Sequence, residues 1–259
     1  MIGLVLRQGG IEFKQFVRTR ESFVFTLLFP AMILLIFGSI FQGTIAGVPF
    51  KQYFAAGMIA SGLLSSGFQN LAISIPIERD RGVLKRFRST PMPKWVYFGG
   101  KFLQVFVIGV LATALLFVIG AFYGLKLPST ADKWFTFIWV FVLGLLACTL
   151  LGIAFSAAAR TGRSGPAVVT PVALILQFIS GVYFPFGSLP HWMQQIAALF
   201  PLKWMCQGMR SVFLPESFAA QEPAGSFELG KVALVLGLWC VAGLVLSLLT
   251  FRWTTKRDG

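Results

Sequence analysis

The chain has 259 residues, of which 56% are hydrophobic and only 12% are charged. Soluble globular domains have about 25% charged residues, so the composition excludes that class of protein. The formal net charge of +13 could indicate a nucleic-acid-binding protein, but the positions of the basic residues argue against a nucleic-acid partner. They gather between long apolar intervals, a pattern typical of basic cytoplasmic loops in a helical membrane protein.

Six charge-free intervals are long enough to cross a bilayer, which takes about 20 consecutive apolar residues. We predict an all-α, polytopic membrane protein with one transmembrane domain over residues 1–259. The predicted spans are residues 22–42, 52–75, 102–124, 134–158, 165–186 and 231–251. With the N-terminus inside, sixteen of the 22 Lys and Arg residues fall on the cytoplasmic side and six outside. This asymmetry predicts a multi-pass protein of the cytoplasmic (inner) membrane with both termini in the cytoplasm.

Residues 1–21 predict a helix at the membrane interface. Its second half is amphipathic, with Lys14 and Arg18 on one face and Phe13 and Phe16 broadly opposite. Such a helix lies in the headgroup layer of the bilayer, with its basic face toward anionic lipid. Gly9-Gly10 is expected to break or bend it. An ordinary basic segment beside the first span is the alternative.

Small residues recur at four-residue steps in the second and fourth spans. They include Gly57 and Ser61 in the second span, and Gly144, Cys148 and Gly152 in the fourth. Small residues allow helix backbones to approach closely, and we expect this packing to occur within the chain.

A polar island at residues 77–94 separates the second span from the third. Because it holds five basic residues between Arg79 and Arg88, it must form a loop on one membrane face. Val83, Leu84 and Phe87 fall on one face at helical spacing. One interpretation is a loop that only fixes the topology. The other is a short helix whose apolar ridge stays exposed until it docks into a soluble partner.

The segment at residues 187–214 predicts outer re-entrant helices. Gly181, Pro185 and Pro190 interrupt a straight helix before it, and Pro201 stops the first short helix. Its rich Trp content fits a place at the outer interface. We expect one apolar, buried face, made of Trp192, Met193, Ile196, Ala197 and Phe200. Gln194 and Gln195 are then expected to form the polar, exposed face.

No catalytic, cofactor-binding or metal-ligating pattern is recognisable. Gly99-Gly100-Lys101 lacks the earlier glycine of a phosphate-binding loop, and His191 has no second ligand nearby. Apart from Lys231 at the first position of the sixth, the predicted spans contain no Asp, Glu, Lys or Arg, so we expect no buried charge and no intramembrane proton relay. An ion channel would need a carbonyl filter or a ring of charges, and neither is visible. A transporter of this composition must take its energy from a partner.

Two motifs resemble the permeases of the ABC type-2 transporter family, in particular the drug- and lipid-export permeases of the daunorubicin-resistance type. The first runs from Glu78 to Leu84 and continues with Ser89-Thr90-Pro91. The second is Ser180-Gly-Val-Tyr-Phe-Pro185, followed by Leu189-Pro190, Pro201-Leu202 and Arg210. Asp80 departs from the pattern, since the family more often has Glu there, but the negative charge is kept.

The resemblance implies a non-enzymatic transport subunit that binds no cofactor itself. Two permease copies, as a homodimer or homologous heterodimer, would pair with two ABC ATPase subunits that carry ATP and Mg. The implied cargo of outward transport is a hydrophobic or amphipathic molecule, drug or lipid-like. Export of a lipid-linked polysaccharide is the alternative, and a non-ABC protein such as an intramembrane enzyme is a weaker one.

The resemblance also implies roles for three sets of residues. The ATPase-coupling set is Glu78, Arg79, Asp80, Arg81, Gly82, Val83, Leu84 and Phe87. The outer re-entrant set is Gly181, Pro185, Pro190, Trp192, Ile196, Phe200 and Pro201. The interface-helix set is Phe13, Lys14, Phe16 and Arg18.

Overall fold

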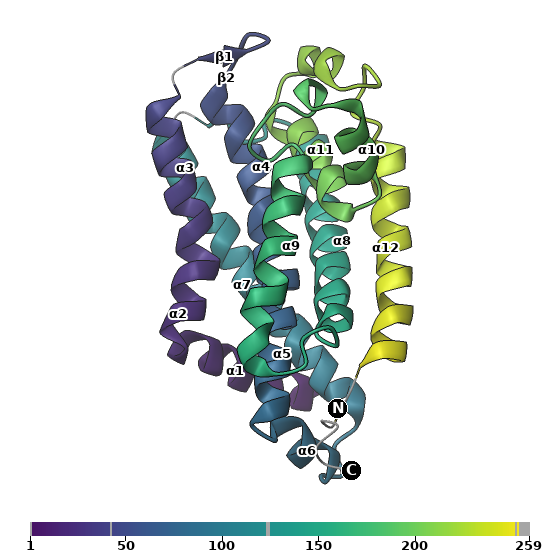
Figure 1. The fold of residues 1–259 in the computed structure, drawn as a ribbon. Helices are drawn as coiled ribbons and strands as arrows, with labels where there is room; N and C mark the ends of the chain where they lie inside the picture. The colour runs from purple at the N-terminus through teal and green to yellow at the C-terminus, as the bar shows by residue number, and fades with distance from the viewer. Residues whose placement is uncertain (1, 42, 123–124, 252, 254–259) are drawn as a thin grey trace.

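The computed structural model describes residues 2–41, 43–122, 125–251 and 253 (Figure 1). The ends of the first and third predicted spans, residues 42 and 123–124, lie outside the described residues, as do residues 252 and 254–259. Within the described chain, six helical stretches are long and apolar enough to cross a membrane. They are Arg20–Ile40, Phe50–Asp80, Lys94–Phe122, Ala131–Phe155, Gly162–Ile179 and Leu229–Thr250. The prediction of an all-α polytopic membrane protein is confirmed.

Three of these stretches are single helices: α7 (Lys94–Phe122), α8 (Ala131–Phe155) and α12 (Leu229–Thr250). The others change geometry along their length. The first consists of α2 (Arg20–Phe23), a π-helical turn η1 (Val24–Leu28) and α3 (Phe29–Ile40). The second consists of α4 (Phe50–Leu64), a π-helical turn η2 (Ser65–Gln69) and α5 (Asn70–Asp80). The fifth begins with a 3-10 turn η3 (Gly162–Ser164) and continues as α9 (Gly165–Ile179).

The six stretches run alongside one another, and shorter elements cover both ends of the bundle (Figure 1). At one end, here named the hairpin end, an antiparallel hairpin pairs β1 (Thr44–Ile45) with β2 (Val48–Pro49). The same end holds η4 (Phe186–Ser188), α10 (His191–Ala198), α11 (Pro201–Phe213) and η5 (Glu216–Gln221). The opposite end, here named the α6 end, holds α1 (Ile2–Arg18) and α6 (Val83–Arg88).

The second stretch is the centre of the bundle, because α4 contacts α3, α7, α8 and α11. Small residues bring other parts of the chain close to this second stretch. A Cβ on Gly57 would lie 2.8 Å from the carbonyl oxygen of Val182, and one on Gly152 would lie 2.7 Å from that of Gly67. The prediction that the small residues pack helices together within the chain is confirmed.

Helix α1 lies across the α6 end of the bundle and packs on α7 (Figure 1). It runs unbroken from Ile2 to Arg18, so the expected break at Gly9-Gly10 is wrong. A Cβ on Gly9 would lie 2.6 Å from Cδ2 of Leu103, and one on Gly100 would lie 2.5 Å from Cγ of Gln8. These glycines therefore serve close packing between α1 and α7. The position of α1 within the headgroup layer of the bilayer stays a prediction.

Candidate functional site

Three consecutive residues at the end of α5 bond to three different parts of the bundle. The hydroxyl of Tyr97 donates a hydrogen bond of 3.0 Å to Oε2 of Glu78, and Lys101 forms a salt bridge with Oε1. Arg79 donates to the carbonyl oxygens of Ser156, at 3.1 Å, and Ala159, at 3.5 Å. Glu78 and Arg79 therefore link α5 to α7 and to the end of α8.

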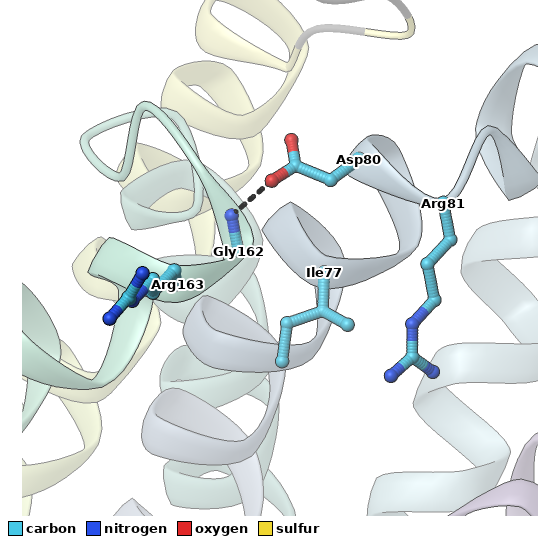
Figure 2. A pocket seen from close by; sticks show the side chains of 5 residues that line it. All are labelled: Ile77, Asp80, Arg81, Gly162 and Arg163. Carbon is cyan, nitrogen blue, oxygen red and sulfur yellow. Dashed lines mark hydrogen bonds between the residues drawn. The ribbon is translucent and has the colours of Figure 1, made fainter.

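Asp80 supplies the third bond. Its Oδ2 accepts a hydrogen bond of 2.6 Å from the backbone N–H of Gly162, at the start of η3 (Figure 2). Ile77, one turn earlier, packs so closely on Gly162 that a Cβ there would lie 2.7 Å from the Cα of Ile77. The glycine therefore allows the turn before α9 to lie directly on α5.

Lys101 lies at the centre of a buried group of charges that the sequence did not reveal. Its ammonium group contacts Oε2 of Glu12 at 2.6 Å as well as Glu78. Lys101, Glu78 and Glu12 are only 1%, 2% and 4% exposed, and they are here named the Lys101 cluster. The expectation of no buried charge is therefore wrong. Lys101 lies inside α7, and its charge is balanced by carboxylates from α1 and α5.

Helix α6 follows α5 after a tight turn at Gly82, whose positive φ of 71° favours glycine. Leu84 is 0% exposed and belongs to the core of the bundle, and the ring of Phe87 lies 5.4 Å from that of Tyr97. The expectation of an exposed apolar ridge at Val83, Leu84 and Phe87 is wrong. The turn at Gly82 directs this face onto the protein itself.

The exposed surface of α6 and its surroundings is basic. Lys85, Arg86 and Arg88 are exposed on α6, and Arg81 precedes it. A surface cavity of about 300 Å³ lies beside this surface, between the end of α5 and η3 (Figure 2). Its lining consists of Ile77, Asp80, Arg81, Gly162 and Arg163. The basic side chains make this end of the molecule suited to an acidic partner.

A second buried charge pair lies at the hairpin end. Arg210 of α11 donates hydrogen bonds to both carboxylate oxygens of Glu222, from Nε to Oε1 at 2.6 Å and from Nη2 to Oε2 at 3.2 Å. It also donates to the carbonyl oxygen of Gly181 at 3.3 Å, as does the hydroxyl of Tyr53 at 3.0 Å. Gly181 has a positive φ of 79° and turns the chain just after α9. Sequence reasoning singled out Arg210 but not its partner Glu222.

Helix α10 presents a different face to the protein from the one we expected. Trp192 and Ile196 are 57% and 44% exposed, whereas Ala197 is buried. Gln194 donates hydrogen bonds to the carbonyl oxygens of Leu189, at 2.8 Å, and Gly187, at 3.5 Å. The predicted burial of Trp192 and Ile196 is wrong, and Gln194, expected on the exposed face, bonds to the preceding loop. Ala197 is buried and Gln195 is exposed, as predicted.

Prolines mark the boundaries of the short elements at the hairpin end. Pro185 and Pro190 directly precede η4 and α10, and Pro201 is the first residue of α11. Phe200 is half-buried, and its ring stacks on that of Trp239 at 6.3 Å. Whether these helices enter the outer leaflet stays a prediction.

Aromatic rings form a continuous chain between α3, α4 and the end of α9. The rings of Phe37 and Phe54 stack at 5.4 Å, as do those of Phe50 and Phe54. The contacts continue to Phe41 on one side and through Tyr183 to Phe178 and Phe184 on the other. A cavity of about 390 Å³ adjoins the chain, lined by Ile40, Phe41, Gly43, Thr44, Ile45 and Phe50. These described lining residues carry no ionisable side chain.

Among the described residues, no group of three or more His, Cys, Asp or Glu side chains is arranged to hold a metal ion. The Lys101 cluster, the Arg210–Glu222 pair and the basic α6 surface are therefore the notable polar features. Glu12 and Lys101 of the cluster lie 89 residues apart in the sequence, whereas Arg210 and Glu222 lie 12 residues apart.

Comparison with known proteins gives a consistent result. The chain is 25% identical over 251 residues to the putative transport permease ycf38 of Cyanophora paradoxa, covering 92% of this chain and 83% of the relative. It is 25% identical over 213 residues to the inner membrane transport permease YadH of Escherichia coli strain K12, covering 78% and 80%. It is 20% identical over 204 residues to the putative transport permease YvfS of Bacillus subtilis, covering 77% and 81%.

Residues 10–214 match the family described as ABC-2 type transporter. This match runs from α1 to the end of α11 and includes the α5–α6 motif and both buried charge groups except Glu222. With six apolar helical stretches among its described residues, the chain is a membrane transport permease that belongs to the ABC-2 type transporter family.

Proposed function

We propose that the chain is the permease subunit of an ATP-driven exporter and that separate ATPase subunits dock at the α6 end. The observation that supports the proposal best is the way in which α6 is attached to the bundle. This short helix is held on the bundle by Leu84 and Phe87 and exposes a basic surface to its surroundings. A helix fixed in this way can transmit a movement of a docked partner directly to the transmembrane helices.

The α6 end is then the cytoplasmic end, and both chain termini are cytoplasmic. The support is electrostatic, because sixteen of the 22 Lys and Arg residues lie on that side of the predicted spans, in the loops, the helix ends and the two terminal segments. The cytoplasmic (inner) membrane is the proposed location. The name of the Escherichia coli relative includes this membrane.

Docking uses the exposed basic side chains of α6 rather than its apolar side. Arg86 and Arg88 point away from the bundle core, whereas Leu84 is already covered by the protein itself. ATP and Mg belong to the ATPase subunits, two of which serve two permease copies. The second copy is either identical, in a homodimer, or homologous, in a heterodimer.

The proposed cargo is hydrophobic or amphipathic, such as a drug or a lipid-like molecule. The chain of aromatic rings and the adjoining cavity support it, since the described residues there offer apolar and π surfaces but no charge. Phe41, Phe178 and Phe184 are each about half exposed. Exposed ring faces of this kind also suit sugar rings, so a lipid-linked polysaccharide is the second candidate.

The docking proposal is tested by reversing the charge of the basic surface. In Arg86→Glu/Arg88→Glu, co-purification of a co-expressed ABC ATPase subunit that binds the parent permease should be lost at normal permease abundance. The matched control is Lys14→Glu/Arg18→Glu, which reverses two exposed charges on α1. Equal co-purification by the two double variants would refute docking at α6.

Leu84→Ala separates docking from folding. Because Leu84 is buried, the substitution should destabilise the permease by about 2–5 kcal/mol. The fraction that remains folded should still bind the ATPase. Normal stability with lost binding would instead support docking through the apolar side.

A further inference from the structure

Three elements that are far apart in the sequence meet at the Lys101 cluster. Glu12 comes from α1, Glu78 from the end of α5 and Lys101 from α7. Each carboxylate has a second donor that fixes its orientation. Gln8 donates to Glu12 at 2.8 Å, and Tyr97 donates to Glu78 at 3.0 Å.

The cluster resists separation because its charges are removed from water. When one partner of a buried ion pair is displaced, the charge of the other is left uncompensated in an apolar environment. Two carboxylates face one ammonium group here, so moving α1 away from α7 would expose or isolate Glu12. Close backbone packing at Gly9 and Gly100 brings α1 and α7 into direct contact beside the cluster.

Helix α6 is connected to the cluster by two routes. Along the chain, Glu78 lies four residues before Gly82, at which α6 turns away from α5. Through space, Phe87 of α6 contacts Tyr97, whose hydroxyl binds Glu78. A displacement of α6 therefore acts on Glu78 from both sides.

We infer that Lys101 is a positioning residue that makes α1 move together with α6. Lys101 holds Glu12 and Glu78 at once, so α1, the α5–α6 turn and the start of α7 form one body. Under the proposed function, on which this part rests, ATPase movement at α6 would be transmitted to α1. A purely stabilising role would instead keep the chain folded without joining the positions of α1 and α6.

The first experiment measures the joint position of α1 and α6 without any ATPase. Spin labels are placed at the exposed residues Gln15 and Arg86, in a chain whose cysteines at 148, 206 and 240 are replaced by alanine. The permease is reconstituted into lipid nanodiscs, and the distribution of distances between the two labels is measured by pulsed electron paramagnetic resonance. The parent chain should give one narrow distribution.

Glu12→Met is the decisive variant, because it leaves Lys101 and Glu78 as a one-to-one pair with no excess charge. We expect its distribution to become broader or to shift. The control Glu21→Met removes an exposed carboxylate from α2 and should leave the distribution unchanged. A distribution for Glu12→Met like that of the parent chain would overturn the inference.

The second experiment adds the ATPase and asks whether movement reaches α1. With labels at Gln15 and at Ser226 of the hairpin end, trapping the complex with ATP and vanadate should shift the distance in the parent chain. Glu12→Met should lose this shift at unchanged ATPase binding. A shift that survives in Glu12→Met would overturn transmission through the cluster.

The two experiments also separate this inference from the proposed function. If no ATPase binds the parent permease, the proposed function fails, while the first experiment still decides whether Lys101 joins α1 to α6. If the ATPase binds but the first experiment shows no change, the inference fails and the proposed function stands.

Discussion

Arg210 shows how a permanently charged side chain can lie inside a membrane protein. Glu222 accepts from two of its guanidinium nitrogens, and the carbonyl oxygen of Gly181 takes a third bond. Arginine presents its donors in a planar fork that matches a carboxylate, so the pair satisfies both charges. The pair connects α11 to the segment after η5 and to the turn after α9.

Removing one member of this pair should be costly. Arg210→Met should lower the free energy of unfolding by about 3–5 kcal/mol, because Glu222 is left buried without a partner. Thermal unfolding in detergent measures the loss, and Lys231→Met, at a largely exposed lysine, is the control. The double variant Arg210→Met/Glu222→Met should recover part of the loss. A double variant no better than Arg210→Met alone would show that the carboxylate is not the source of the penalty.

Lys203, also in α11, should give the stability a pH dependence. Burial lowers its pKa to about 8, with Glu222 raising it and Arg210 lowering it. In the unfolded chain a lysine has a pKa of about 10.4. Between about pH 8 and 10.4 the unfolded chain therefore holds a proton that the folded chain has lost, and the free energy of unfolding rises with pH.

The test compares melting temperatures across that interval. Lys203→Met should show a smaller rise between pH 8 and 10 than the parent chain, whereas Lys231→Met should follow the parent. Parallel curves for all three proteins would contradict the lowered pKa of Lys203.

At the scale of elements, backbone contact between helices fixes the centre of the bundle. Gly67 in η2 and Gly152 in α8 face each other, and a Cβ on Gly67 would lie 2.8 Å from that of Cys148. Such an approach allows extensive dispersion contact between backbones, which drives helix association within lipid.

A methyl group at this contact should separate α8 from η2. Gly152→Ala should destabilise the protein by about 1–3 kcal/mol, because the carbonyl oxygens of Gly67 and Phe68 cannot yield without moving backbone. Gly237→Ala in α12, where nothing lies within 4 Å, should change stability by less than about 1 kcal/mol. Thermal unfolding of both variants checks the contrast. Similar losses of stability at the two positions would mean that helix propensity, and not packing, determines the effect of Gly152→Ala.

Helical periodicity found α6 and α10 but not the direction of their apolar faces. In water an apolar face must turn inward, so periodicity alone predicts what is buried. That rule fails for α10, where Trp192 and Ile196 are exposed and the side chain of Gln194 donates a hydrogen bond to the carbonyl oxygen of Leu189. On α6, the turn at Gly82 placed Leu84 in the core instead.

For the whole molecule, the six spans were predictable because hydrocarbon thickness sets their length and tolerates few charges. The Lys101 cluster was not predictable, since Glu12 lies 89 residues and Glu78 lies 23 residues before Lys101. Local charge counts place Lys101 at the border of a span but cannot show which carboxylates neutralise it. Long-range ion pairs of this kind depend on helix arrangement, which a single sequence does not encode locally.

The proposed orientation predicts which side of the membrane each end faces. Ser89→Cys at the α6 end and Ser226→Cys at the hairpin end are matched, near-isosteric substitutions at exposed positions. A membrane-impermeant maleimide added to intact cells, with the outer membrane permeabilised, should label Cys at 226 but not at 89. After the inner membrane is opened, both should react. Labelling of the α6 end in intact cells would reverse the assignment.

The Lys101 cluster also has a consequence for the order in which the protein assembles. Glu12 and Glu78 both precede Lys101, so both carboxylates are synthesised before the lysine. Their contacts involve only α1, α5 and α7, and the cluster can close without the fourth, fifth and sixth spans. Arg79 differs, because its acceptors Ser156 and Ala159 are translated later. The N-terminal half can therefore close the Lys101 cluster by itself, and Arg79 then joins it to the end of α8.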